Sequence, residues 1–183
     1  MIFRLFRKDP QRILIASLYK RVAEASRVPG LYAGLGIPDT LEGRFESLSL
    51  HMVLTLRALR LLPPPADELA KDLTDAFFQD LDASLREMGA GDTVVPKRMK
   101  KLASSFYGRA HAYDAPLDRK DEAALALALG RNALGSDAPA SPLARYALTA
   151  DLDLKQADLA SLLERGPVFP NSEAFAGEKH HDA

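Results

Sequence analysis

The sequence has no cysteine, and it has no apolar run long enough to cross a membrane. Without cysteine, a disulfide framework, a thiolate metal site and a cysteine nucleophile are excluded, and a reducing compartment is favoured. The most apolar stretch, 13–19, is far short of the ~20 residues of a transmembrane helix. The first ten residues are basic but have no small-residue cleavage site, so we expect no secretory signal. The sequence therefore predicts a soluble, cytoplasmic protein.

Charge is nearly balanced overall but uneven along the chain. The formal net charge is −1, which gives no general attraction to nucleic acid or anionic lipid. Residues 67–92 hold eight acidic residues against two basic ones, and 97–109 hold five basic residues and no acidic one. Blocks of this kind are typical of differently charged faces of one domain.

Apolar residues recur at helical spacing along most of the chain, and no stretch alternates with the period of a strand. The pattern predicts helices over about 10–26, 39–62, 66–88, 96–113 and 118–129, and two short ones that start at Ser141 and Asp151. Asp39 and Asp118 are the expected N-caps of the second and fifth of these helices, the first within a capping box with Glu42. The segment between the first two helices is expected to be a glycine- and proline-rich loop.

The expected fold is therefore all-α, a single globular domain of about six or seven helices over 1–165. The tail over 166–183 has no periodicity and is predicted to be flexible and disordered. The second helix is apolar on two opposite sides, which indicates that it runs through the centre of the domain. The residues expected in the core are Phe45, Met52, Leu56, Leu73, Phe77, Leu81, Leu102 and Phe106.

Little in the sequence indicates catalysis or a cofactor. The H-E-x-x-H, G-x-S-x-G and nucleotide-loop motifs are absent. His51 on the central helix has two interpretations, a hydrogen-bonded interior side chain or a contact to a partner. His111 is expected at the surface, and His180 with His181 and Asp182 lies in the tail, where a stable metal site would lack fixed geometry. We therefore predict a protein that is not an enzyme and holds no cofactor or metal.

The basic start of the fourth helix has two possible roles as well. By the 3.6-residue period, Lys97, Lys100 and Lys101 share one face with Ser104, Gly108 and His111. Small residues at Ser104 and Gly108 would allow close approach of another backbone, whereas the alternative is a solvated basic face. Specific nucleic-acid binding favours a basic domain with aromatic platforms, so no specific DNA binding is expected.

Two stretches resemble a known family. They are GIPDTLEGRFESLSLHMVLTLRALR at 36–60 and FFQDLDASLREMGAGDTVVPKRMKKLASSFYGRAHAY at 77–113. Together they resemble the bacterial branch of the ubiquinol–cytochrome c chaperone family, with similarity over roughly residues 10–150. The resemblance implies an all-helical assembly factor that binds cytochrome b and assists biogenesis of the cytochrome bc complex.

The resemblance also implies partners and contact residues. Mitochondrial relatives act with a small partner protein near the ribosomal tunnel exit, so a ribosome or a small partner protein is possible here. The implied contact residues, to which the shared helical face adds Ser104 and Gly108, are Asp82, Arg86, Asp92, Lys97, Arg98, Lys100, Lys101, Tyr107 and Arg109. The alternative function is a helical RNA- or ribosome-binding module that uses the basic helix 97–113.

The start of the chain offers one further contact. Phe3 and Phe6 lie among Arg4, Arg7 and Lys8, and basic and aromatic residues together are favoured at a membrane interface. Residues 1–12 are thus either a peripheral membrane contact or a frayed terminus.

Overall fold

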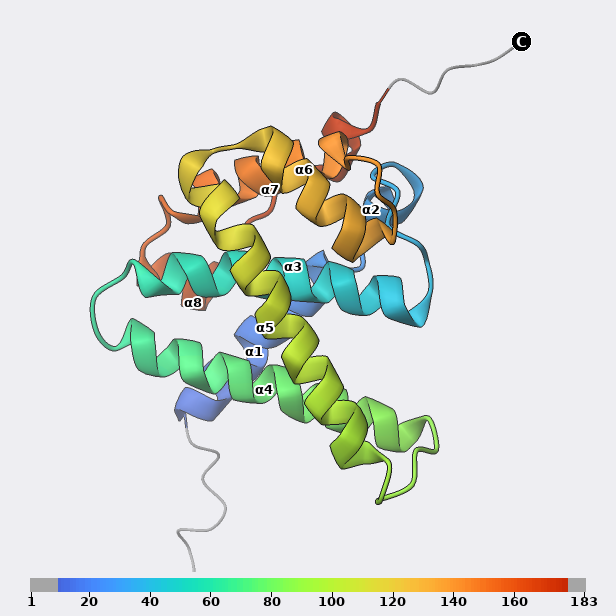
Figure 1. Ribbon diagram of the computed structural model, residues 1–183. Coiled ribbons are helices and arrows are strands. Elements are labelled where there is room, and N and C mark those ends of the chain that lie inside the picture. Colours follow the sequence, from blue (N-terminus) through green and yellow to red (C-terminus); the bar gives the residue numbers. More distant parts are fainter. Residues whose placement is uncertain (1–9, 178–183) are drawn as a thin grey trace, which may run out of the picture.

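The computed structural model describes residues 10–177, which form helices and no strand (Figure 1). The predicted all-α fold is confirmed. The elements are α1 (Pro10–Ala25), α2 (Pro29–Ala33), α3 (Leu41–Arg60), α4 (Ala66–Glu87), α5 (Val95–Arg119), α6 (Glu122–Leu129), the π-helical turn η1 (Gly130–Leu134), α7 (Ser141–Leu154), α8 (Leu159–Arg165) and the 3-10 turn η2 (Ser172–Phe175). None of these helices is long and apolar enough to cross a membrane.

Helix α3 lies at the centre of the fold, as its two apolar sides predict. It contacts α1, α4, α5 and α7, and most of its residues from Glu46 to Leu59 are buried. Helix α5 crosses over both α3 and α4 (Figure 1), and its C-terminal half then leads into α6, which packs on α7. Because α3 is enclosed on several sides, its polar residues are buried as well and must find partners inside the protein.

The structure corrects the expected start of α3 and adds a short helix before it. The cap of α3 is Thr40, whose hydroxyl accepts a hydrogen bond of 3.1 Å from the Gly43 amide. Asp39 instead pairs with Arg44 at 2.8 Å. The segment before α3 also contains the short helix α2, where the sequence predicts only a loop. Pro29 stands in its first turn, a position where a missing N–H costs nothing.

Helix α5 is longer than the sequence pattern predicts. It continues through Pro116 to Arg119, and Lys120 ends it in the left-handed conformation with φ 53°. Asp121, rather than the expected Asp118, caps α6 by accepting a hydrogen bond of 3.0 Å from the Ala124 amide. A proline inside a helix usually weakens it, so the last turn of α5 needs support from elsewhere.

Four of the eight expected core residues are fully buried. They are Met52, Leu73, Phe77 and Phe106. The other four are only half-buried, namely Phe45, Leu56, Leu81 and Leu102. Phe45, Leu56 and Leu81 pack against the edge of the main core, and Leu56 also lines a surface groove. Leu102 does not belong to this set and lies on the projecting part of α5.

The packed chain extends further than residue 165. Phe169 meets the His51 ring edge-on with 4.5 Å between ring centres, and Phe175 meets Tyr146 at 5.8 Å. The expectation of a disordered tail from residue 166 is therefore wrong for 166–175, because isolated aromatic residues anchor the segment without any periodic pattern. Residues 1–9 and 178–183 lie outside the described residues, and with them Phe3, Arg4, Phe6, Arg7, Lys8, His180, His181 and Asp182.

Replacing Phe77 by alanine tests the aromatic part of the core. Phe77 is fully buried, and its ring centre lies 4.9 Å from that of Phe106 and 5.0 Å from that of Phe78. Deleting a buried phenylalanine ring costs about 3–5 kcal/mol of unfolding free energy. Urea unfolding followed by circular dichroism should show this loss, whereas Leu61→Ala, at a side chain 63% exposed, should change it by less than about 0.5 kcal/mol. Equal midpoints for the two variants would contradict the assignment.

Candidate partner-binding site

Helix α5 presents one continuous exposed strip to solvent. Its members, Lys97, Lys100, Lys101, Ser104, Gly108 and His111, are all exposed, as the helical period predicts. A side chain built at Gly108 would meet no atom within 4 Å, so nothing in the described part of the chain covers this strip. Arg98 is exposed too, and Tyr107 is 57% exposed beside the strip.

Four of the predicted contact residues have partners within the chain. Arg86 donates to Asp82 and to Asp92, each at 2.6 Å, and so ties the end of α4 to the loop that follows. Arg109 donates two hydrogen bonds to the Glu46 carboxylate, of 3.0 Å from Nε and 2.7 Å from Nη2. Burial raises the pKa of Glu46 and outweighs the hydrogen bond with Arg109, which lowers it. These four residues shape the surface of α4 and α5.

A groove opens where α5 crosses α3 and α4, which we call the crossing groove. Its volume is about 370 Å³. Its lining consists of Val53, Leu56, Arg60, Ala70, Lys71, Thr74, Asp75, Phe106, Tyr107 and Ala110. The floor is apolar, and the charged rim carries both signs.

Of the groove residues, only Tyr107 is among the contacts that the family resemblance implies. The sequence predicts Leu56 and Phe106 as core residues, and nothing in the sequence predicts a role for Ala70 or Thr74. The groove exists because three helices cross at this point, and helix crossings follow from tertiary packing rather than from the period of any one helix. A half-buried apolar residue such as Leu56 is visible only once the neighbouring helices are in place.

His51 belongs to the interior. It is fully buried, with Nδ1 2.7 Å from the Ser47 carbonyl oxygen and Nε2 2.8 Å from the Tyr146 hydroxyl. A carbonyl only accepts, so Nδ1 carries the proton and Nε2 accepts from Tyr146. Burial lowers the pKa of His51 to about 4. Of the two interpretations, the structure therefore supports a hydrogen-bonded interior side chain.

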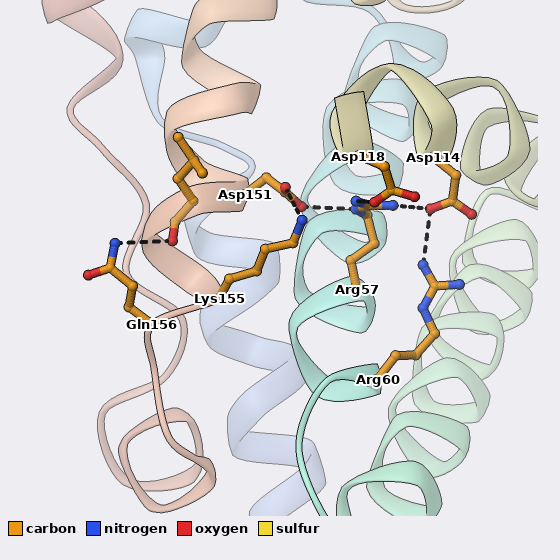
Figure 2. A network of polar contacts seen from close by, with 8 residues as sticks. Arg57, Arg60, Asp114, Asp118, Asp151, Lys155 and Gln156 are labelled. Carbon is orange, nitrogen blue, oxygen red and sulfur yellow. Dashed lines mark hydrogen bonds and ion pairs between the residues drawn. The ribbon is translucent and has the colours of Figure 1, made fainter. Parts of the chain in front are cut away.

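A second buried group, Arg57, joins three helices in one ionic network (Figure 2). Its side chain is 5% exposed. From α3 it donates to Asp151 of α7 at 2.9 Å and, on α5, to Asp118 at 2.6 Å and to Asp114. Burial lowers the pKa of Arg57, but the hydrogen bonds with these carboxylates outweigh it, and the guanidinium stays charged.

The network extends to two more cations. Asp151 also accepts from Lys155 at 2.7 Å, and Asp114 from Arg60 at 3.0 Å. Each buried charge thus faces an opposite one, which is the condition for keeping charges in an interior. The network fixes where α5 crosses α3, and it holds the last turns of α5 on both sides of Pro116. Within 10–177, no group of three or more histidine and acidic side chains is arranged to hold a metal ion.

Comparisons with known proteins find similarity over most of the chain. The family model described as "Ubiquinol-cytochrome C chaperone" matches residues 33–169, a range that includes the crossing groove and the exposed strip. Among solved structures, the chain is similar to the Cbp3 homolog from Brucella abortus, with 39% sequence identity and a TM-score of 0.79. This similarity covers 94% of this chain and 98% of the other. A search of the curated proteins finds no match.

Arg57→Ala should be strongly destabilising, because it leaves the buried Asp151 carboxylate with only Lys155 as partner. Removing one member of a buried ionic group costs about 3–5 kcal/mol. Arg60→Ala removes an exposed partner of the same network and should cost no more than about 1 kcal/mol. Chemical unfolding of both variants gives the comparison, and similar losses for the two would show that Arg57 has no special role.

His51 should make stability depend on pH below neutrality. Its pKa is about 4 when folded, against an ordinary value of 6.5, so below pH 6.5 the unfolded chain takes up a proton that the folded one refuses. Unfolding free energy should be unaffected by this group above pH 6.5. It should fall by up to about 1.4 kcal/mol per pH unit between 6.5 and 4.

The measurement is a series of unfolding curves for the wild type and His51→Gln across this pH range. The variant starts from a lower stability but should have a shallower dependence on pH, because glutamine does not titrate. Parallel curves for the two proteins would refute the role of His51.

Proposed function

Since the chain belongs to the ubiquinol–cytochrome c chaperone family, we propose that it holds cytochrome b while the ubiquinol–cytochrome c reductase complex is assembled. Family membership makes it an assembly chaperone of that complex, a role in binding rather than in catalysis. The client, its binding surface and the place of action are our proposals. The crossing groove is the observation that carries them.

The groove has the chemistry that a segment of a membrane protein requires. Such a segment presents apolar side chains along one face and charged residues at its ends. The apolar floor, with Val53, Leu56 and Phe106, would cover some of the apolar side chains, and the rim would meet the flanking charges. Binding of an amphipathic helix in an apolar groove is a recurring mode of peptide recognition. Covering such surface protects a nascent membrane protein from aggregation.

Tyr107 connects the groove to the exposed strip. Its ring lies 5.4 Å from that of Phe106 on the groove floor and 6.1 Å from that of Phe78, so it is held in place yet exposed. An exposed tyrosine supported by other rings is a frequent anchor in protein interfaces. We propose that the client crosses Tyr107 from the groove onto the strip, where the small residues Ser104 and Gly108 allow close approach. Lys100, at the end of the same strip, would then meet an acidic flank of the client.

The place where the protein acts follows from how its client is made. A client that is inserted into the membrane as it is made requires a chaperone on the side where synthesis occurs. We therefore propose that the protein works at the cytoplasmic face of the membrane. A ribosome or a small partner protein on the remaining surface stays a prediction.

Filling the groove should abolish the function without unfolding the protein. Thr74 lines the groove, and within residues 10–177 its hydroxyl bonds only to the Ala70 carbonyl of its own helix. Thr74→Trp should therefore block the space at small cost in stability. Gln79→Trp adds the same ring to an exposed position of α4 outside the groove lining and serves as the matched control.

The two variants are to be compared in a strain that lacks the gene. Deletion should lower the amount of assembled cytochrome bc complex while other respiratory complexes persist. Gln79→Trp should restore the complex and Thr74→Trp should leave it at the level of the deletion strain, with equal melting temperatures for the two purified proteins. Full restoration by Thr74→Trp would show that the client binds elsewhere, and an unaltered complex in the deletion strain would contradict the function itself.

A further inference from the structure

The far end of the α4–α5 pair stands away from the body of the protein. Figure 1 shows the loop between these helices at one extremity of the molecule, remote from α6 and α7. Between Val95 and Phe106, no residue of α5 is buried. Leu85 and Val95 are buried, yet neither belongs to the main core cluster. This end of the α4–α5 hairpin therefore lies outside the main core and projects into solvent.

The tip of the hairpin, residues 88–94, exposes apolar side chains. Met88 is 52% exposed and Val94 is 41% exposed. Side chains added at Gly89 and Gly91 would meet no atom within 4 Å, so nothing in the described structure lies over the loop. Exposed apolar residues at the end of a projection are available to an apolar environment outside the protein.

Four cations follow directly behind the tip. Lys97, Arg98, Lys100 and Lys101 are exposed, and none of them has an ion pair within residues 10–177. Of the acidic residues that precede them most closely, Asp92 is bound to Arg86, and Glu87 forms no ion pair with these cations within residues 10–177. By the helical period, Arg98 and Lys101 share one side of α5 with Val94. The apolar tip and the free positive charges thus act on the same side.

We propose that this hairpin tip docks on the surface of a lipid bilayer that carries anionic headgroups. Positive charges next to a membrane are attracted by its negative surface potential, and apolar residues beside them enter the boundary between headgroups and acyl chains. Met88 and Val94 supply the apolar part, and Lys97, Arg98 and Lys101 supply the charge.

RNA fits the same tip less well. Single-stranded nucleic acid binds through stacking on aromatic rings, and residues 88–101 contain none. Nucleic acid also offers no interior that would take up Met88 and Val94. The combination of apolar and basic residues therefore favours the bilayer.

The position of the tip gives the contact a use that goes beyond holding the client. From Val94 to Tyr107 the helix rises about 20 Å, at 1.5 Å per residue. A tip on the bilayer would thus keep the crossing groove within about that distance of the membrane surface. A membrane-protein client can be received there before or during its insertion.

Vesicle flotation with the purified full-length chain tests the proposal. The protein should float with vesicles that contain phosphatidylglycerol and stay behind with vesicles of pure phosphatidylcholine, and added salt should weaken the binding. Lys97→Glu with Lys101→Glu, and separately Met88→Asp with Val94→Asp, should each lower the apparent affinity at least about tenfold. Lys120→Glu with Arg131→Glu changes the net charge equally at exposed positions and should stay within about twofold of the wild type.

Folding and the rival sites need their own controls. Melting temperatures identify a variant that has unfolded, and Met88→Ser with Val94→Ser then replaces the aspartate pair. Thr74→Trp should float like the wild type, so that a failure of the groove and a failure of the tip remain distinct. The proposal is overturned if the wild type ignores anionic vesicles, or if Arg4→Glu with Arg7→Glu abolishes flotation while the tip variants retain it. Binding of an RNA oligonucleotide without binding of vesicles would assign the basic residues to nucleic acid and overturn it too.

Discussion

The ionic network around Arg57 is the constraint on which the rest of the arrangement depends. One guanidinium on the central helix binds carboxylates from α5 and α7, and Figure 2 shows them gathered around it from both sides. Because Asp114 and Asp118 flank Pro116, the network holds the C-terminal half of α5 where a proline would otherwise weaken the helix. The crossing of α5 over α3 is thereby fixed, and the crossing angle determines where the groove opens.

Helix α5 is thus divided into a fixed half and a projecting half. The fixed half carries Tyr113, Pro116 and Leu117, which are buried, and it packs against α6. The projecting half has no buried residue between Val95 and Phe106, and its four lysine and arginine residues before Phe106 form no ion pair within residues 10–177. A surface of this kind is free to bind without disturbing the core, since the elements that move or bind are usually those with few buried contacts. The groove lies at the junction of the two halves.

The long helices and the central place of α3 could be predicted from the sequence because they follow from local periodicity. Two short helices could not: α2 lies where a loop is expected, and α8 begins at Leu159, whereas the expected start, Asp151, lies inside α7. The exposed strip from Lys97 to His111 could be predicted for the same reason. The Arg57 network could not, because its members look like surface charges and Asp151 is 94 positions away along the chain. Nor could the groove or the packing of Phe169 on His51, which both depend on the arrangement of several helices. Resemblance to a family indicated the function, whereas the binding surface that we propose is argued from the fold.

Photo-crosslinking from the crossing groove in living cells would identify the molecule that occupies it. A photoreactive amino acid at Lys71, an exposed residue of the groove lining, samples whatever occupies the groove, and one at Glu122, exposed on α6, samples the opposite part of the molecule. If the groove holds the client, illumination should crosslink newly made cytochrome b to the photoreactive residue at position 71 and not to the one at position 122. Mass spectrometry identifies the crosslinked protein. Capture of cytochrome b from position 122 alone, or at neither position, would contradict the proposal.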